Sequence, residues 1–225
     1  MSNLLKFWKK WSYIILIAFL ILGMFDFRIG LIALICMITP IIVSIFKGRF
    51  WCGNLCPRGS LYDNVVSKFS NKNKAPKLLK TVYFRGLVIT MMLSVFIIGM
   101  IKNWGDLYEM GLVIYRLIVV TTIIGLALAP FYNERTWCNF CPMGSFAAIG
   151  SKFKNNKNKN VLLNINDTCV ECKICTKTCP MGIDVHEYKG EFLTHYDCIQ
   201  CGRCVNKCPK KSIGYTTTQW LKQGI

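Results

Sequence analysis

Eight cysteines near the C-terminus stand in two runs that share one spacing. Residues 169–180 read CVECKICTKTCP and residues 198–209 read CIQCGRCVNKCP, so both follow C-x2-C-x2-C-x3-C-P. This spacing is typical of [4Fe–4S] ligation, in which three close thiolates hold one cubane and the fourth cysteine reaches the neighbouring one. The pattern predicts two crossed ligand sets: Cys169, Cys172, Cys175 and Cys208 for the first cluster, and Cys198, Cys201, Cys204 and Cys179 for the second.

Zinc and disulfides are the alternative uses of clustered cysteines. Zinc prefers paired C-x2-C units with four ligands per site, which a crossed eight-cysteine pattern fits poorly. Disulfides are disfavoured in a reducing cytoplasm, where the topology below places these residues. His186 and His195 lie between the two runs, and an ordinary surface role is favoured over ligation or a proton relay. The chain has no C-x-x-C-H motif and no histidine in its apolar runs, so we expect no haem.

A second cysteine motif occurs twice in the first 150 residues. Residues 51–59 read WCGNLCPRG and residues 137–144 read WCNFCPMG. Gly-Ser, Ser-Lys-Phe and an Asn/Lys tail then recur in the same order, which indicates an internal duplication. A parallel repeat can bring equivalent residues together near an axis along the membrane normal. Four cysteines could then converge, namely Cys52, Cys56, Cys138 and Cys141.

Three roles are open for these four cysteines. They could form a third iron–sulfur centre or another metal site, because four thiolates make a complete ligand set. Each motif could instead hold a redox-active dithiol, since Cys138 and Cys141 have the C-x-x-C spacing. The third role is a structural turn with small buried side chains. We expect Cys36 to serve packing, and Trp51 and Trp137 to anchor the chain at the membrane interface.

Four long apolar runs must position these motifs. They cover roughly residues 8–25, 29–46, 82–101 and 112–132, and each approaches or exceeds the length of a bilayer span. The first resembles a secretory signal but lacks a small-x-small cleavage site. The sequence therefore predicts an α-helical membrane protein with four transmembrane helices arranged as two tandem hairpins. The expected order is a transmembrane domain (1–150), a basic linker (151–164), a small α+β domain of the bacterial 2[4Fe–4S] ferredoxin type (165–215) and a tail (216–225).

The charges predict the orientation of the helices. The chain carries a net charge of +17, and its lysines concentrate in the N-terminal tail, the loop between the second and third runs, and the C-terminal region. Positive charge in short loops marks the cytoplasmic side, so both termini and all the cysteine motifs should face the cytoplasm from the inner (cytoplasmic) membrane. Topology and anionic lipid headgroups account for this charge, so we expect the lipid bilayer, and no nucleic acid, as a partner.

Two arginines lie within or beside the apolar runs. Arg116 stands about five residues into the fourth run from its outer end, and a charge at such a depth is a candidate functional group. It could hold a quinone carbonyl or pair with Glu109 or Asp106, although snorkelling to the outer headgroups is favoured. Arg85, at the inner edge of the third run, is expected to snorkel in the same way.

The combination of four spans, the motifs WCGNLCP and WCNFCP, and the eight-cysteine region resembles the NapH/NosR-like family of membrane [4Fe–4S] polyferredoxins. The resemblance covers nearly the whole chain and is closest to the short NapH-like form. The longest outer loop, about residues 102–111, cannot hold the flavin-bearing domain of the NosR branch, so flavin is doubtful. The second motif also departs from the family pattern, with two residues between its cysteines instead of three.

The resemblance implies electron transfer between membrane quinol and a redox partner protein. The residues reveal no acid–base or nucleophilic constellation, so an enzymatic role, as part of a quinol dehydrogenase, rests on the resemblance alone. Two alternatives use the same features differently. One is a redox-responsive assembly or maturation factor whose motif cysteines handle thiols or metal, and the other is a membrane anchor that docks a partner.

Overall fold

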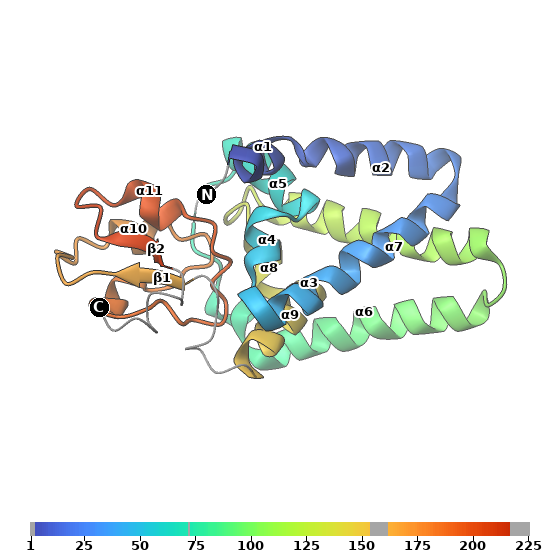
Figure 1. Cartoon of the computed structure of the whole chain (residues 1–225). Coiled ribbons are helices and arrows are strands. Elements are labelled where there is room, and N and C mark those ends of the chain that lie inside the picture. Colours follow the sequence, from blue (N-terminus) through green and yellow to red (C-terminus); the bar gives the residue numbers. More distant parts are fainter. Residues whose placement is uncertain (1–2, 72, 154–161, 217–225) are drawn as a thin grey trace.

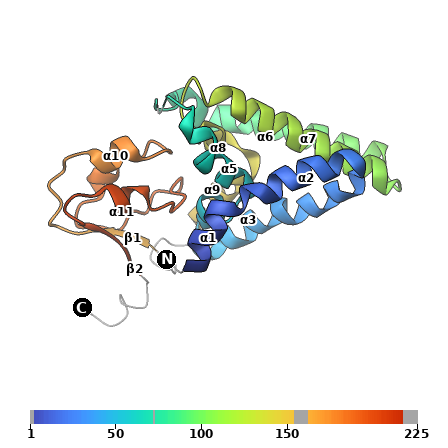
Figure 2. The ribbon, with the colours of Figure 1, turned by 90° about the horizontal axis from the view of Figure 1, so that it is seen from above.

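Four apolar helical segments lie side by side, and a small cysteine-rich domain covers one end of them (Figure 1). Figure 2 shows the same separation from above. The structure, a computed structural model, describes residues 3–71, 73–153 and 162–216. Most of the predicted linker (154–161) and nearly all of the predicted tail (217–225) lie outside the described residues.

The first apolar run forms a bent pair of helices. Helix α1 (Asn3–Trp11) and helix α2 (Tyr13–Phe25) meet at Ser12, and the two axes differ by 41°. The basic residues Lys9 and Lys10 belong to the last turn of α1, whereas α2 carries no charge. With 13 residues, α2 alone is about 20 Å long. It therefore needs part of α1 to cross a bilayer.

Three further segments are long and apolar enough to span a membrane. They are Phe27–Lys47 (η1, Phe27–Ile32, continued by α3, Ala33–Lys47), α6 (Val82–Lys102) and α7 (Leu107–Leu128). Their outer faces expose large apolar side chains such as Ile35, Met91 and Ile123, as contact with lipid requires. Small residues let η1 and α7 approach closely, since a Cβ on Gly30 would collide with the carbonyl oxygen of Gly111. The described residues thus contain three helical segments that are long and apolar enough to span a membrane, or four when α1 and α2 count as one.

Each half of the helical region ends in the same pair of short helices. In the first half these are α4 (Phe50–Asn54) and α5 (Pro57–Asn64), and in the second α8 (Thr136–Phe140) and α9 (Pro142–Phe153). Helices α5 and α9 both begin at the proline after the second motif cysteine, a position that suits proline. The halves interlock, because α9 packs on α3 and because Gly125 of α7 leaves room for Tyr62 of α5.

The C-terminal domain is built around one antiparallel strand pair. Strand β1 (Leu162–Ile165) pairs with β2 (Ile213–Thr216), so this domain begins within the stretch predicted to be a linker. Helices α10 (Ile174–Thr178) and α11 (Arg203–Lys207) lie within the two cysteine runs, and η5 (Val185–Tyr188) lies between the runs. The 3-10 turns η2 (Val66–Lys68) and η3 (Lys77–Lys80) connect α5 to α6. Buried aliphatic side chains form the core of the domain, among them Ile165, Ile183, Val185, Leu193 and Ile199.

Candidate iron–sulfur centres

The two C-terminal cysteine runs share an unusual backbone conformation. Each places three residues in the left-handed region at the same offsets from its first cysteine, with φ between 52° and 78°. The two sets are Glu171, Lys173 and Gly182, and Gln200, Gly202 and Lys211. Side-chain-bearing residues adopt this region only at a cost, and turns of this kind present backbone N–H groups to anions. Both loops are therefore shaped as anion-binding concavities.

The structure groups the eight cysteines around two cavities. Cys169, Cys172 and Cys175 of the first run share a cavity with Cys208 of the second. Cys198, Cys201 and Cys204 share another with Cys179 of the first run. We call the first of these the distal cavity. We call the second the proximal cavity, because its residues contact the membrane helices. The two groups are the same crossed sets that the spacing predicts.

The arrangement of the thiols fits a multi-atom core. Within residues 3–71, 73–153 and 162–216, no group of three or more His, Cys, Asp or Glu side chains is positioned to hold a metal ion. Four thiolates form the complete ligand set of a cubane of iron and sulfide. His186 also lines the distal cavity, where its Nδ1 lies 2.9 Å from the hydroxyl of Thr176.

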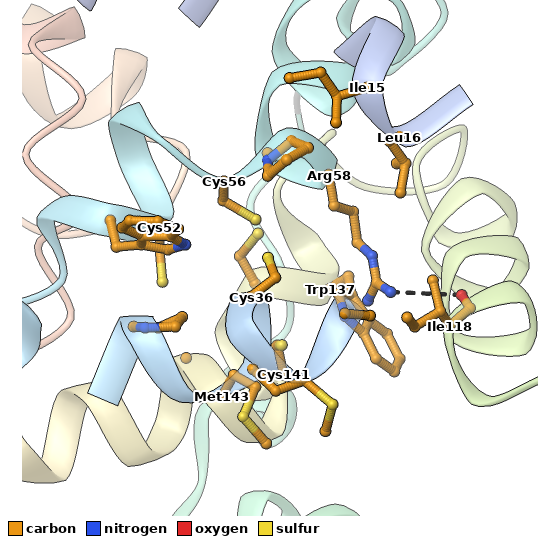
Figure 3. A pocket seen from close by; sticks show the side chains of 18 of the residues that line it. Ile15, Leu16, Cys36, Cys52, Cys56, Arg58, Ile118, Trp137, Cys141 and Met143 are labelled. Carbon is orange, nitrogen blue, oxygen red and sulfur yellow. Dashed lines mark hydrogen bonds between the residues drawn. The ribbon is translucent and has the colours of Figure 1, made fainter. Parts of the chain in front are cut away.

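A third cavity, of about 240 Å³, lies where the two helical halves meet (Figure 3). We call it the junction cavity. All four Trp-Cys motif cysteines line it: Cys52, Cys56, Cys138 and Cys141. Cys36 of α3 is a fifth thiol in its wall, where the sequence suggested only packing. The remaining wall is mostly apolar and includes Leu16, Phe19, Ala33 and Met37.

Two equivalent arginines cross between the halves beside this cavity. Arg49 and Arg135 each stand two residues before a Trp-Cys pair, and each side chain is almost fully buried. Arg49 donates a 2.7 Å hydrogen bond to the carbonyl of Cys138, and Arg135 donates one of 2.7 Å to the carbonyl of Cys52. Nη1 of Arg135 also lies 3.7 Å from Sγ of Cys138. These reciprocal bonds hold the two motifs face to face.

The proximal loop docks directly on the junction. Asp197, which precedes Cys198, is buried between Arg49 at 2.8 Å and Arg85 at 2.8 and 3.0 Å. Gly53 is the extra residue of the first motif, and a Cβ there would collide with the carbonyl oxygen of Ile199. Cys52 and Cys138 pack against the core of the C-terminal domain. The proximal cavity therefore adjoins the junction cavity.

A second ion-pair network secures the same interface. Asp63 of α5 binds Arg135 through both carboxylate oxygens, at 2.8 and 2.9 Å, and Arg203 of α11 at 2.8 Å. Arg203 also pairs with buried Glu134. Burial alone would raise the pKa of Asp63, but the charge and hydrogen bonds of Arg135 outweigh it, so the pKa of this carboxyl is lowered. The carboxylate is therefore ionised at neutral pH.

Comparison with known proteins agrees with this geometry. Residues 29–76 and 115–160 match the family described as 4Fe-4S binding domain, and residues 168–213 match the 4Fe-4S dicluster domain. The ferredoxin-type protein NapH of Escherichia coli is 24% identical over 82% of this chain and 67% of its own length. The chain belongs to the NapH-like family of membrane 4Fe-4S proteins. The predicted family is thereby confirmed.

Other relatives match most of this chain. The putative electron transport protein YccM of Escherichia coli is 23% identical over 80% of this chain and 54% of its own length. An uncharacterized protein of Methanocaldococcus jannaschii is 28% identical over 80% of this chain and 77% of its own length. No solved structure matches the chain. This NapH-like protein is an iron–sulfur electron-transport protein of the membrane that binds 4Fe-4S clusters.

The thiols of the NapH-like junction are poorly suited to dithiol chemistry. Burial raises the pKa of Cys52 and of Cys56 to about 11, and Arg49 opposes this rise at Cys52. Burial also raises the pKa of Cys138, against the opposing charge of Arg135. Thiol–disulfide exchange needs the thiolate, whereas a metal centre displaces the protons of its own ligands. Burial therefore favours the protonated form of these three thiols.

One arginine of the cavity was missed at the sequence level. The side chain of Arg58 points into the junction cavity and donates a long 3.4 Å hydrogen bond to the carbonyl of Ile118 (Figure 3). Its counterpart in the second motif is Met143, and this difference between otherwise similar motifs was the available signal. Arg116 is instead exposed, stands tenth in α7 and is not among the lining residues.

Three further expectations are corrected by the structure. Arg85 does not snorkel, because its guanidinium is buried against Asp197. Trp137 is no interfacial anchor, since it is 4% exposed and packs on Phe140 within the helical core. His195 is a local structural residue, with Nδ1 accepting the backbone N–H of Asp197 at 3.1 Å. The partner of Arg85 is 112 residues away in the sequence, whereas Trp137 and His195 meet partners that lie close to them in the chain.

Proposed function

We propose that this NapH-like protein takes electrons from a membrane quinol and passes them to a redox partner protein at the cytoplasmic side. Two 4Fe-4S clusters would be held by the distal and proximal cysteine sets, and a third iron–sulfur centre by Cys52, Cys56, Cys138 and Cys141. These groups supply one-electron storage when bound. The chain supplies ligands, buried surroundings and hydrogen bonds, which together set their potentials.

The position of the junction cavity carries this proposal. Its thiol-lined part adjoins the proximal loop, through Cys52 and Cys138. Its apolar part is lined by Ile15 and Ile32, which are also 48% and 61% exposed on the outer face of the helices. The cavity thus extends from the lipid-facing surface to the docking site of the cluster domain. A lipid-soluble two-electron carrier could enter between α2 and η1.

Arg58 is the residue that we assign to the quinol. It is a charged group in a mostly apolar wall, and its only recorded hydrogen bond among the described residues, to Ile118, is long. A guanidinium there can donate to a quinol or quinone oxygen and orient the ring toward the thiols. Arg116 lies away from this cavity, on the outer face of α7, and a quinone role for it would require a separate site.

Charge supports the cytoplasmic orientation. The C-terminal domain and both short-helix pairs gather at one end of the bundle (Figure 1). Lys9 donates to the carbonyl of Cys201 at 3.0 Å, and Lys80 to that of Met181 at 2.6 Å. The opposite end carries Asp26, Asp106 and Glu109 together with Arg28 and Lys102, so charges of both signs nearly balance there. The side rich in lysine is the cytoplasmic one in membrane proteins.

The first test is a count of iron and acid-labile sulfide, with EPR, on protein purified without oxygen. Three four-iron centres give about twelve irons per chain, and Cys52→Ser should lower this number to about eight. Cys36→Ser is the matched control, because it removes a thiol of the same cavity from outside the motifs. A wild-type count of about eight, unchanged by Cys52→Ser, would refute the third centre.

The second test separates the electron donors. Protein in proteoliposomes is mixed with menaquinol or ubiquinol, and cluster bleaching is followed in the visible spectrum. We expect quinol to reduce the clusters. Spectra that stay unchanged with both quinols, while a reduced soluble ferredoxin bleaches them, would rule out the quinol role and leave the iron–sulfur assignment intact.

A further inference from the structure

Arg49, one of the two buried arginines of the junction, has a hydrogen-bond donor without an acceptor. Arg49 donates from Nη1 to the carboxylate of Asp197 and from Nη2 to the carbonyl of Cys138. Its Nε is buried and has no hydrogen-bond partner among the described residues, and Arg49 lines the junction cavity. An unpaired buried donor is unfavourable because it has lost its hydrogen bonds to water without replacement. Such a donor beside the four cysteines points to an anion that would accept from it.

The charge of the proposed third centre requires cations nearby. Four thiolates in a buried site carry a large negative charge, which is costly unless it is compensated. Arg49 and Arg135 are both 1% exposed, and each bonds to a motif cysteine of the opposite half. They are thus placed on the two sides of the thiol set in equivalent ways.

The two arginines differ in the carboxylate with which each forms an ion pair. Arg135 is fixed by Asp63 of the first half. In the second half the residue equivalent to Asp63 is Ala148, so no membrane carboxylate serves Arg49 in the same way. The C-terminal domain supplies the missing acid, Asp197, next to Cys198 of the proximal set. One arginine is therefore fixed within the membrane region and the other by the docked domain.

We propose that Arg49 and Arg135 are the counter-charges of a centre in the junction cavity, and that Arg49 links the potential of that centre to docking of the C-terminal domain through Asp197. This inference rests on the proposed function, because it needs the third centre. Both arginines act as positioning and charge-compensating residues and are not ligands. An undocked domain would leave Arg49 without its carboxylate and so change the charge balance of the centre.

The test is an EPR-monitored redox titration of each centre. Removal of a cation makes an anionic centre harder to reduce, so Arg49→Gln and Arg135→Gln should each lower its midpoint potential. We expect the ratio of reduced to oxidised junction centre at fixed potential to fall about tenfold, which is about 59 mV for a one-electron couple. Arg49→Lys keeps the charge, so its midpoint potential should stay close to that of the wild type. Arg28→Gln, at an exposed position far from the cavity, should have no effect.

Asp197→Asn provides a test of opposite sign. Loss of this carboxylate frees the charge of Arg49, so the midpoint of the junction centre should rise. Asp184→Asn is the control, since Asp184 is half exposed and its only ion pair among the described residues, with Lys74, measures 3.9 Å. Iron content is measured in every variant to show that the centres are present.

The outcomes separate this inference from the proposed function. A third EPR species with full iron content, whose midpoint is the same in wild type, Arg49→Gln and Arg135→Gln, would make the arginines purely structural and overturn the inference. Absence of a third species from the wild type would instead refute the third centre itself. Should Arg49→Gln lose iron, the midpoint of Arg135→Gln decides, since Asp63 there keeps Arg203 and Lys9 as partners.

Discussion

The guanidinium of Arg49 donates a 2.7 Å hydrogen bond to the backbone carbonyl of Cys138, which belongs to the other half of the helical region. Arg135 returns the same contact to Cys52. Glycines make room for both, because a Cβ on Gly144 would lie 2.5 Å from Arg49 and one on Gly59 would lie 2.7 Å from Arg135. The two copies of the internal repeat therefore contact each other symmetrically, and the arginine of each copy holds the motif of the other.

Asp197→Asn should loosen the C-terminal domain. The substitution leaves Arg49 and Arg85 buried against a neutral group, and breaking a buried pair in this way costs about 3–5 kcal/mol. Hydrogen exchange measured by mass spectrometry should show faster exchange in α4 and in residues 196–204. Asp184→Asn should leave exchange unchanged, since an exposed pair contributes about 0–1 kcal/mol. Equal protection in the two variants would show that the ion pairs of Asp197 with Arg49 and Arg85 do not hold the C-terminal domain in place.

Gly53→Ala should disturb docking without touching a charge. The added methyl group would collide with the carbonyl oxygen of Ile199, so either α4 or the proximal loop must move. We expect limited proteolysis to release the C-terminal domain several-fold faster than from the wild type. Gly86→Ala is the control, because nothing lies within 4 Å of a Cβ at Gly86. Identical cleavage rates would show that Gly53, the extra residue of the first motif, is not needed for docking of the C-terminal domain.

Gly202→Ala should destabilise the proximal cluster loop. Gly202 has φ of +78°, and a Cβ there would lie 2.5 Å from the hydroxyl of Tyr215. The left-handed conformation alone costs about 1–2 kcal/mol for a residue with a side chain. Chelator-induced loss of cluster absorbance should become faster than in the wild type. Gly214→Ala, with nothing within 4 Å, should behave like the wild type; faster loss there as well would point to general fragility of the strand pair.

Arg58→Met should impair reaction with quinol while the iron content stays constant. Methionine is the residue that the second motif carries at the equivalent position, so it should fit the cavity wall. A hydrogen bond from a charged donor contributes about 1.5–3 kcal/mol. Its loss predicts about a tenfold to hundredfold lower rate of cluster reduction by quinol. Reduction by dithionite is the control and should be unchanged. A normal quinol rate would remove Arg58 from the site.

Acid should weaken the second ion-pair network through Asp63. Its pKa is lowered in the folded protein, so its stabilising contribution is fully present above the unfolded pKa of about 3.9 and is lost as the pH falls through the lower folded value. The difference in unfolding temperature between wild type and Asp63→Asn should therefore be largest near pH 7 and shrink below pH of about 4. A difference that does not depend on pH would mean that the carboxylate charge is not what stabilises the interface.

The spacing of nearby residues determined much of this protein in advance. The two cysteine runs predicted 4Fe-4S clusters, and their combination with the Trp-Cys motifs and the apolar runs predicted the family; the comparisons confirm both. The apolar runs predicted helical spans, because any stretch of that length must satisfy its backbone internally in lipid. Both results depend on intervals of a few residues, or on the length of a single helix, and such intervals can be read directly from the chain.

Tertiary contacts decided the rest. Cys36 and Arg58 reach the junction cavity because helices from both halves meet there, and Arg85 is buried because Asp197, 112 residues away, docks on it. The break at Ser12 follows from α1, where the carbonyl of Lys9 accepts from Ser60 and Asn64, so α1 lies on α5 instead of extending α2. Side-chain type and local spacing cannot encode which distant partner a residue will meet. That choice is made only when the two halves and the C-terminal domain pack together.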